Sequence, residues 1–147
     1  MLARLKKMLL DDAAEPHREP HDIKLAAAAL LVEVARADHD QLPEEEQAMG
    51  RLLASTLELS AEEVDEILER AGTAVEEATS LYEFTRLVND HYGPDDKRAL
   101  IAAMWEVAYA DDELDKYEEH IIRRVAELIY LPHAEFMRTK HEAAARR

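Results

Sequence analysis

Carboxylates gather at two places in this chain, and at both they follow the end of an apolar, alanine-rich stretch. The first place reads EVARADHDQLPEEE from Glu33, and the second reads EVAYADDELDKYEE from Glu106. Several carboxylates in one short loop repel one another, and a bound cation offsets that repulsion. Oxygen ligands suit hard ions such as Ca²⁺, Mg²⁺ or Mn²⁺. The repeated phrase therefore indicates a divalent-metal site.

The first candidate ligands are Asp38 and Asp111. Each stands at the end of a predicted helix, where a carboxylate faces the negative end of the helix dipole at a cost of about 0.3–1 kcal/mol unless positive charge is near. Asp40 and Glu113 add negative charge within a few residues. The alternative for the two aspartates is that their side chains accept hydrogen bonds from the amides of the following helix.

Other catalytic and metal motifs are absent from the sequence. Counted from Asp38 or Asp111, neither loop has the glycine at position 6 or the glutamate at position 12 of an EF-hand. There is no Glu-x-x-His, HExxH, glycine-rich phosphate loop or G-x-S-x-G motif. A metal-dependent hydrolase has no convincing base or nucleophile here, so we expect no enzymatic activity.

The elements that must position these loops are helices, because apolar residues recur with helical spacing and no run alternates as a strand does. The first helix should carry Leu30, Leu31 and Val34 on one stripe. Ser60 and Glu63 form a capping box for a helix that we expect Gly72 to interrupt. The predicted helices cover Ile23–Ala37, Pro43–Leu57, a segment from Ser60, Leu81–His91, Pro94–Ala110, a segment after DDELD, and a short last helix from LPHAEFM.

The order of these elements repeats along the chain. Aligning Glu33 with Glu106 places Glu46 on Glu118 after a gap of one residue, and Leu59 on Leu131. We therefore predict an all-α compact bundle of about seven helices with an internal pseudo-twofold repeat. Its unit is helix, acidic loop, helix, turn and short helix, occurring twice. Residues 1–22 form an N-terminal amphipathic segment and linker, and residues 23–143 form the helical domain.

The charge balance limits the partners. The chain of 147 residues carries 33 acidic and 18 basic residues, for a net charge of −15. Between residues 38 and 83 there are fourteen acidic residues and two basic ones. Such a surface repels phosphate backbones, which argues against nucleic acid, and attracts cations or a basic protein. The alternative is a solvated acidic face that keeps the protein soluble.

Location follows from what the sequence lacks. With no cysteine and no apolar stretch of the ~20 residues that span a bilayer, we expect a cytoplasmic protein without a transmembrane segment. Residues 1–10, MLARLKKMLL, are amphipathic and basic. They are expected to dock on the rest of the domain, the alternative being a weak contact with a membrane surface.

Three segments carry a family resemblance: LAAAALLVEVARAD…EEE, LYEFTRLVNDHY and ALIAAMWEVAYADDELDKYEEHIIRRVAELIYLPHAEFMRTK. From about Ile23 to Lys140 the chain resembles the tellurite-resistance protein TerB family, and above all its stand-alone bacterial members of unassigned activity. The family phrase Ala-Asp-Gly followed by Glu corresponds to Ala37-Asp38 with Glu46 and to Ala110-Asp111 with Glu118. His39 and Asp112 replace its glycine, at positions where glycine would permit positive φ.

The resemblance implies an all-helical domain of roughly seven helices with internal symmetry and an acidic metal-binding surface. It also implies a role in tellurite or other stress response within multi-protein assemblies, and no known reaction. The ligands that it implies are Asp38, Glu46, Asp111 and Glu118. For Glu46 the alternative is a place in the first turn of a helix, where the positive end of the dipole stabilises acidic residues. For Glu118 the alternative is an acidic capping box with Asp115, DKYE.

The function expected from the sequence is a non-enzymatic divalent-cation-binding or sensing module in a bacterial stress-response assembly of the tellurite-resistance kind. The alternative is a metal-free acidic adaptor that recruits a basic protein partner. Six residues make up the candidate metal site: Asp38, Asp40, Glu46, Asp111, Glu113 and Glu118.

Overall fold

A computed structural model describes residues 23–37, 47–52, 54, 60–110 and 115–146 of the chain. None of these residues is in a strand, and most are helical, so the predicted all-α bundle is confirmed. A short helical stretch covers residues 47–52. The other helices are α2 (Ile23–Ala35), α4 (Ala61–Glu77), α5 (Tyr82–His91), α6 (Pro94–Ala108), α7 (Lys116–Leu128) and α8 (His133–Ala145).

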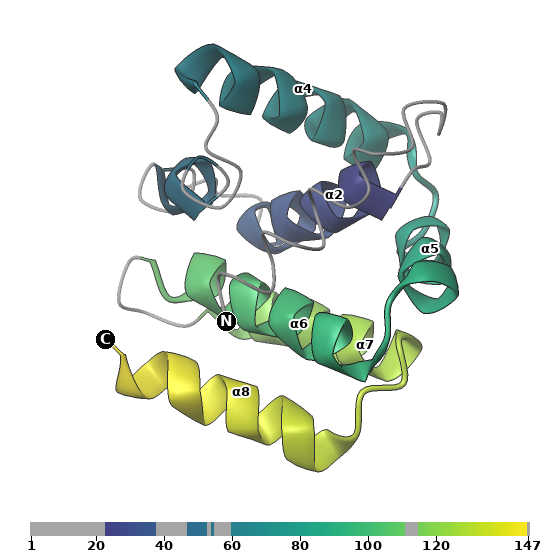
Figure 1. Cartoon of the computed structure of the whole chain (residues 1–147), viewed down its shortest axis with the longest axis vertical. Helices are drawn as coiled ribbons and strands as arrows, with labels where there is room; N and C mark the ends of the chain where they lie inside the picture. Colours follow the sequence, from purple (N-terminus) through teal and green to yellow (C-terminus); the bar gives the residue numbers. More distant parts are fainter. Residues whose placement is uncertain (1–22, 38–46, 53, 55–59, 111–114, 147) are drawn as a thin grey trace.

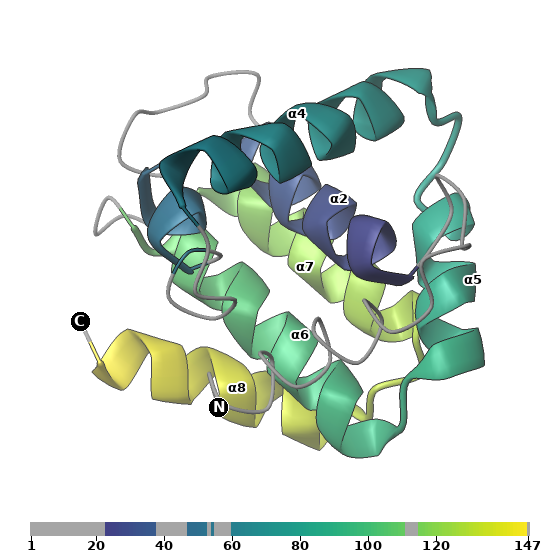
Figure 2. The same ribbon diagram turned by 45° about the horizontal axis from the view of Figure 1, so that its top comes forward.

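The core is built around α2 and α6, which pack against each other. Helix α4 and α5 cover α2, while α7 and α8 contact α6, so the bundle is layered from α4 to α8 (Figures 1 and 2). Almost every side chain described in α2 is buried, including the whole run Ala26–Ala29 at 2% exposure or less. The predicted stripe of Leu30, Leu31 and Val34 is buried, as expected. The buried surface of α2 is wider than this stripe, because the helix is apolar on all sides.

Local sequence signals set where α4 and α6 begin. Ser60 caps α4 through the predicted capping box: its Oγ accepts from the Glu63 amide at 3.2 Å, and its own amide donates to Glu63 Oε1 at 2.9 Å. Pro94 opens α6 after Gly93. The third helix of each unit is longer than expected, with 17 residues in α4 and 13 in α8. The internal repeat as a whole stays a prediction.

The expected interruption at Gly72 is wrong, since α4 continues through this buried residue. A Cβ on Gly72 would lie 3.0 Å from Nη2 of Arg36. Arg36 follows α2 and forms an ion pair with Glu76 of α4, with 3.6 Å between Nη1 and Oε1. The glycine thus leaves room for an arginine side chain, although glycine within a helix costs about 0.5–1 kcal/mol relative to alanine.

Trp105 joins α6 to α8 in the core. Its side chain is fully buried and its ring lies 5.5 Å from that of Phe136, centroid to centroid. Trp105 Nε1 donates to Thr139 Oγ1 at 3.1 Å, and that hydroxyl donates to the Phe136 carbonyl at 2.7 Å. The threonine therefore satisfies an indole N–H that has no access to water.

The end of α7 holds Tyr130, the one non-glycine residue with positive φ (62°) in the described part of the chain. The Tyr130 amide donates to Glu127 O at 3.1 Å and the Leu131 amide to Ala126 O at 2.9 Å, the bonds of a Schellman motif. Glycine is the usual residue at this position because a Cβ is strained there. The tyrosine side chain is 79% exposed, so little packing offsets the strain.

Thr139→Val should lower the free energy of unfolding by about 1–3 kcal/mol, because it keeps the shape of the side chain but leaves the buried Trp105 N–H without its acceptor. Thr139→Ser keeps the hydroxyl and should cost only the removed methyl group, about 0.8 kcal/mol. Urea titration followed by Trp105 fluorescence measures both. Equal losses would show that the hydrogen bond contributes little.

Tyr130→Gly should raise the free energy of unfolding by about 1 kcal/mol, because glycine adopts positive φ without the strain of a Cβ. Tyr130→Ala is the matched control: it also removes the ring, which Lys97 approaches at 6.0 Å, but it keeps the Cβ. Chemical denaturation of the two variants gives the difference. A gain for alanine as large as that for glycine would rule out backbone strain as the cause.

Candidate functional site

The two acidic phrases begin on helix ends with the same backbone geometry. After α2, the amide of Arg36 donates to Val32 O at 3.0 Å and that of Ala37 to Val34 O at 3.2 Å. After α6, the amides of Tyr109 and Ala110 make the matching bonds to Trp105 O at 2.9 Å and Val107 O at 3.2 Å. Each acidic loop therefore leaves its helix in the same way.

Helices α2 and α6 also run in the same sense, so their carboxyl ends lie on one side of the bundle (Figures 1 and 2). Helix α7 starts on that side as well, because it runs back along α6. The sequence could not say whether the two loops start near one another or on opposite faces. Their starting points share one side of the molecule.

Of the six candidate ligands, the described residues include one. Glu118 is the third residue of α7, and its side chain is 1% exposed. A carboxylate removed from water in this way is costly unless hydrogen bonds or positive charge compensate it. The other five lie outside the described residues: Asp38, Asp40, Glu46, Asp111 and Glu113.

Asp115 caps α7. This confirms the Asp115 half of the capping box that was the alternative for this segment. Its Oδ1 accepts from the Tyr117 amide at 2.7 Å. Glu118 does not complete a solvent-exposed capping box with Asp115, because its side chain is buried. The periodicity of α7 explains why: Glu118 lies on the same face as Ile122 and Val125, which are fully buried.

The neighbouring Glu119 shows what a compensated carboxylate looks like at this end of α7. Its Oε2 accepts from Lys140 Nζ of α8 at 2.8 Å and from Arg123 Nη2 at 3.2 Å. The hydrogen bond from Lys140 is the main reason why the pKa of Glu119 is lowered. Glu119 therefore anchors α7 to α8, and its charge is already balanced within the bundle.

Two further carboxylates, Glu33 and Glu106, stand at matching positions in the last turns of α2 and α6. Burial raises the pKa of both, and a nearby arginine partly offsets the effect: Arg36 for Glu33 and Arg146 for Glu106. Sequence reasoning did not include them among the site residues, although they open the two copies of the repeated phrase.

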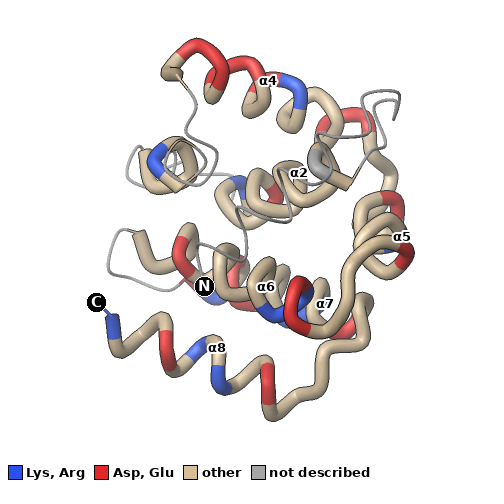
Figure 3. Tube along the Cα trace, viewed as in Figure 1, with Lys and Arg blue, Asp and Glu red and all other residues tan. Residues whose placement is uncertain are grey.

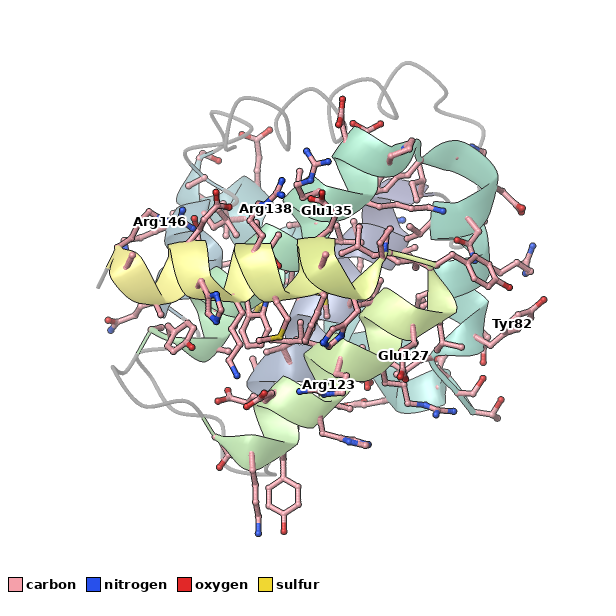
Figure 4. The ribbon with its side chains drawn as sticks, turned by 90° about the horizontal axis from the view of Figure 1, so that it is seen from below. Tyr82, Arg123, Glu127, Glu135, Arg138 and Arg146 are labelled. Carbon is pink, nitrogen blue, oxygen red and sulfur yellow. The ribbon has the colours of Figure 1, made fainter. Side chains whose placement is uncertain are left out.

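The same two arginines connect helix ends within each predicted unit. Arg36 links the end of α2 to Glu76 near the end of α4, and Arg146, after the last residue of α8, pairs with Glu106 at 3.5 Å between Nη2 and Oε1. Figure 4 shows Arg146 at the end of α8. The arginine comes from the first helix in one unit and from the third in the other. Each acidic loop thus begins close to a fixed positive charge.

The chemistry available at this side of the bundle is that of carboxylates and arginines. No group of three or more His, Cys, Asp or Glu side chains that could hold a metal occurs within the described residues. None of the helices there is long and apolar enough to cross a membrane.

Comparison with known proteins gives one match. The model of a family described as tellurite resistance protein TerB matches residues 24–141. No curated protein and no solved structure matches the chain.

Glu106→Gln should be more stable than the wild type at pH 7. A carboxyl group whose pKa is raised on folding stabilises the folded state while protonated, and that contribution is lost as the pH rises through the folded pKa. Glutamine stays neutral, so the advantage of the variant should shrink as the pH falls toward 4.5, the ordinary pKa. Urea unfolding across that range measures it.

Glu142→Gln is the matched control, because it removes one charge from an exposed position of α8. Its difference from the wild type should change much less with pH. A Glu106→Gln variant that is less stable at pH 7 would mean that the attraction of Arg146 outweighs the burial of the carboxylate.

Proposed function

The chain belongs to the tellurite resistance protein TerB family, and from this membership we propose that it is a non-enzymatic divalent-cation-binding module. Its sites are the two acidic loops, with Ca²⁺, Mg²⁺ or Mn²⁺ as the candidate ions. Its setting is a bacterial stress-response assembly of the tellurite-resistance kind, in which it senses the cation or responds to it.

The observation that carries the proposal is the buried carboxylate of Glu118. It lies in the first turn of α7, directly after the loop that contains Asp111 and Glu113. Glu119, beside it, is paired with Lys140 and Arg123, and Glu118 lies on the inner face of α7 with Ile122 and Val125. A carboxylate held at the inner edge of an acidic loop is a suitable oxygen ligand, because its position is set by the core.

The common direction of α2 and α6 supports a joint role for the two loops. Asp38 follows the end of one helix and Asp111 the end of the other, and both ends lie on one side of the bundle. A bound divalent ion supplies positive charge that lowers the repulsion among these carboxylates. The chain's own part is to hold Glu118 in place and to let the loop carboxylates approach it.

A second candidate function, the metal-free adaptor, is favoured by a different observation. Helix α4 carries seven acidic residues and one basic residue, all of them exposed, and it lies at the edge of the bundle in Figure 3. A helix with that charge attracts a basic protein surface over several ångströms. This candidate needs no cation and uses a different part of the molecule.

Thermal melts with added Ca²⁺, Mg²⁺ or Mn²⁺ test the cation proposal. A cation that binds only the folded protein raises its stability by RT ln(1 + [L]/Kd), about 2.7 kcal/mol at a hundredfold excess over Kd. The wild type should show a saturable rise. Asp38→Asn/Asp111→Asn and Glu118→Gln should lose most of it. Fluorescence of Trp105, six residues before Asp111, reports on the same end of α6.

Glu127→Gln serves as the control, because it removes one charge from an exposed position near the other end of α7 (Figure 4). It should keep the full response. If no ion produces a saturable rise in the wild type, the cation proposal is wrong. If Glu118→Gln responds as fully as the wild type, Glu118 is not a ligand.

A further inference from the structure

A cavity of about 480 Å³ opens where α4, α5 and the first turn of α2 meet. Helices α4 and α5 both pack against α2, and the end of α4 lies near the start of α5 in Figures 1 and 2. The cavity has the size of an ordinary ligand pocket. It lies at the opposite end of α2 from the acidic loop, so the proposed cation site does not account for it.

The walls of this cavity combine an apolar floor with an acidic rim. Leu25 of α2 and Phe84 of α5 are buried side chains that form part of the floor. Glu69 and Glu77 of α4 and Glu83 of α5 bring three carboxylates to the lining. An apolar surface bounded by one sign of charge suits an amphipathic ligand of the opposite charge.

The carboxylates on the rim differ in what they already bind. Oε2 of Glu83 accepts from the amide of Thr79 at 2.9 Å and so helps to start α5. Glu69 and Glu77 are exposed, and their carboxylates have no hydrogen bond or ion pair with any described residue. They stand eight positions apart on α4, roughly 12 Å along the helix. These two carboxylates are therefore available to a partner.

We propose that this cavity, from here on called the α4–α5 groove, binds a basic amphipathic segment of a partner protein. One apolar side chain of the segment enters the cavity between Leu25 and Phe84, and flanking Lys or Arg side chains pair with Glu69 and Glu77. This inference rests on the adaptor function, whose site and partner chemistry it specifies, and it is independent of cation binding.

A protein segment fits better than other cationic ligands, because it uses both parts of the groove. A metal ion gains nothing from the side chains of Leu25 and Phe84, and a phosphate-bearing ligand is repelled by the rim. The surrounding charge of α4 adds long-range attraction for a basic segment. Among the described residues of the lining, Arg70 is the single basic one and opposes such a partner.

The test uses fluorescence anisotropy with the full chain and a labelled model peptide, LKKLLKKLLKKL. Wild-type protein should bind it saturably at low salt, and a peptide of the same composition without helical spacing should bind less tightly. Glu69→Gln/Glu77→Gln should weaken binding about fivefold, as expected for the loss of two partly exposed ion pairs. Arg70→Gln should tighten binding, because it removes the opposing charge.

Glu62→Gln/Asp65→Asn is the matched control: it removes the same charge from the same helix outside the groove. It should weaken binding less than the Glu69/Glu77 pair does. Equal weakening would overturn the groove while leaving a diffuse acidic adaptor. No binding to the wild type would overturn the groove and the adaptor function together. Tighter binding after Arg4→Gln/Lys6→Gln/Lys7→Gln would assign the groove to this chain's own first residues instead of a partner.

Discussion

Every other feature of this bundle depends on the burial of α2 and α6. Helix α2 presents apolar side chains in all directions, and four consecutive alanines leave room for neighbours on every side. A helix of this kind is stable only when it is covered completely, so α4, α5, α6 and α7 all contact it. The charged residues of α2 and α6 consequently stand near the ends of these helices, and most others lie on the remaining helices.

This placement creates the electrostatic problem at the carboxyl ends of α2 and α6. Acidic loops begin where the helix dipole is negative, and the last turns already hold the half-buried Glu33 and Glu106. Arg36 and Arg146 offset part of this negative charge, and their ion pairs connect the helix ends to α4 and α8.

The two ends of α2 consequently offer different surfaces. Its carboxyl end leads into the first acidic loop. The carboxyl end of α6, which leads into the second loop, and the first turn of α7 with the buried Glu118 lie on the same side. The amino end of α2 contributes Leu25 to a cavity with α4 and α5, whose lining includes the exposed carboxylates of Glu69 and Glu77. The two ends of α2 thus lead to different parts of the molecule, the acidic phrase at one end and the cavity beside α4 and α5 at the other.

The sequence alone determined the helical class, the capping box at Ser60, the start of α6 at Pro94 and the family, because periodicity, caps and motifs are local. It also indicated where the acidic phrases lie. It could not show that Gly72 lies inside a helix, since the reason is the side chain of Arg36 from another element. Nor could it show that Glu118 is buried while Glu119 pairs with Lys140, or that α2 and α6 point the same way. Those facts depend on which helices meet in space, which only the tertiary structure decides.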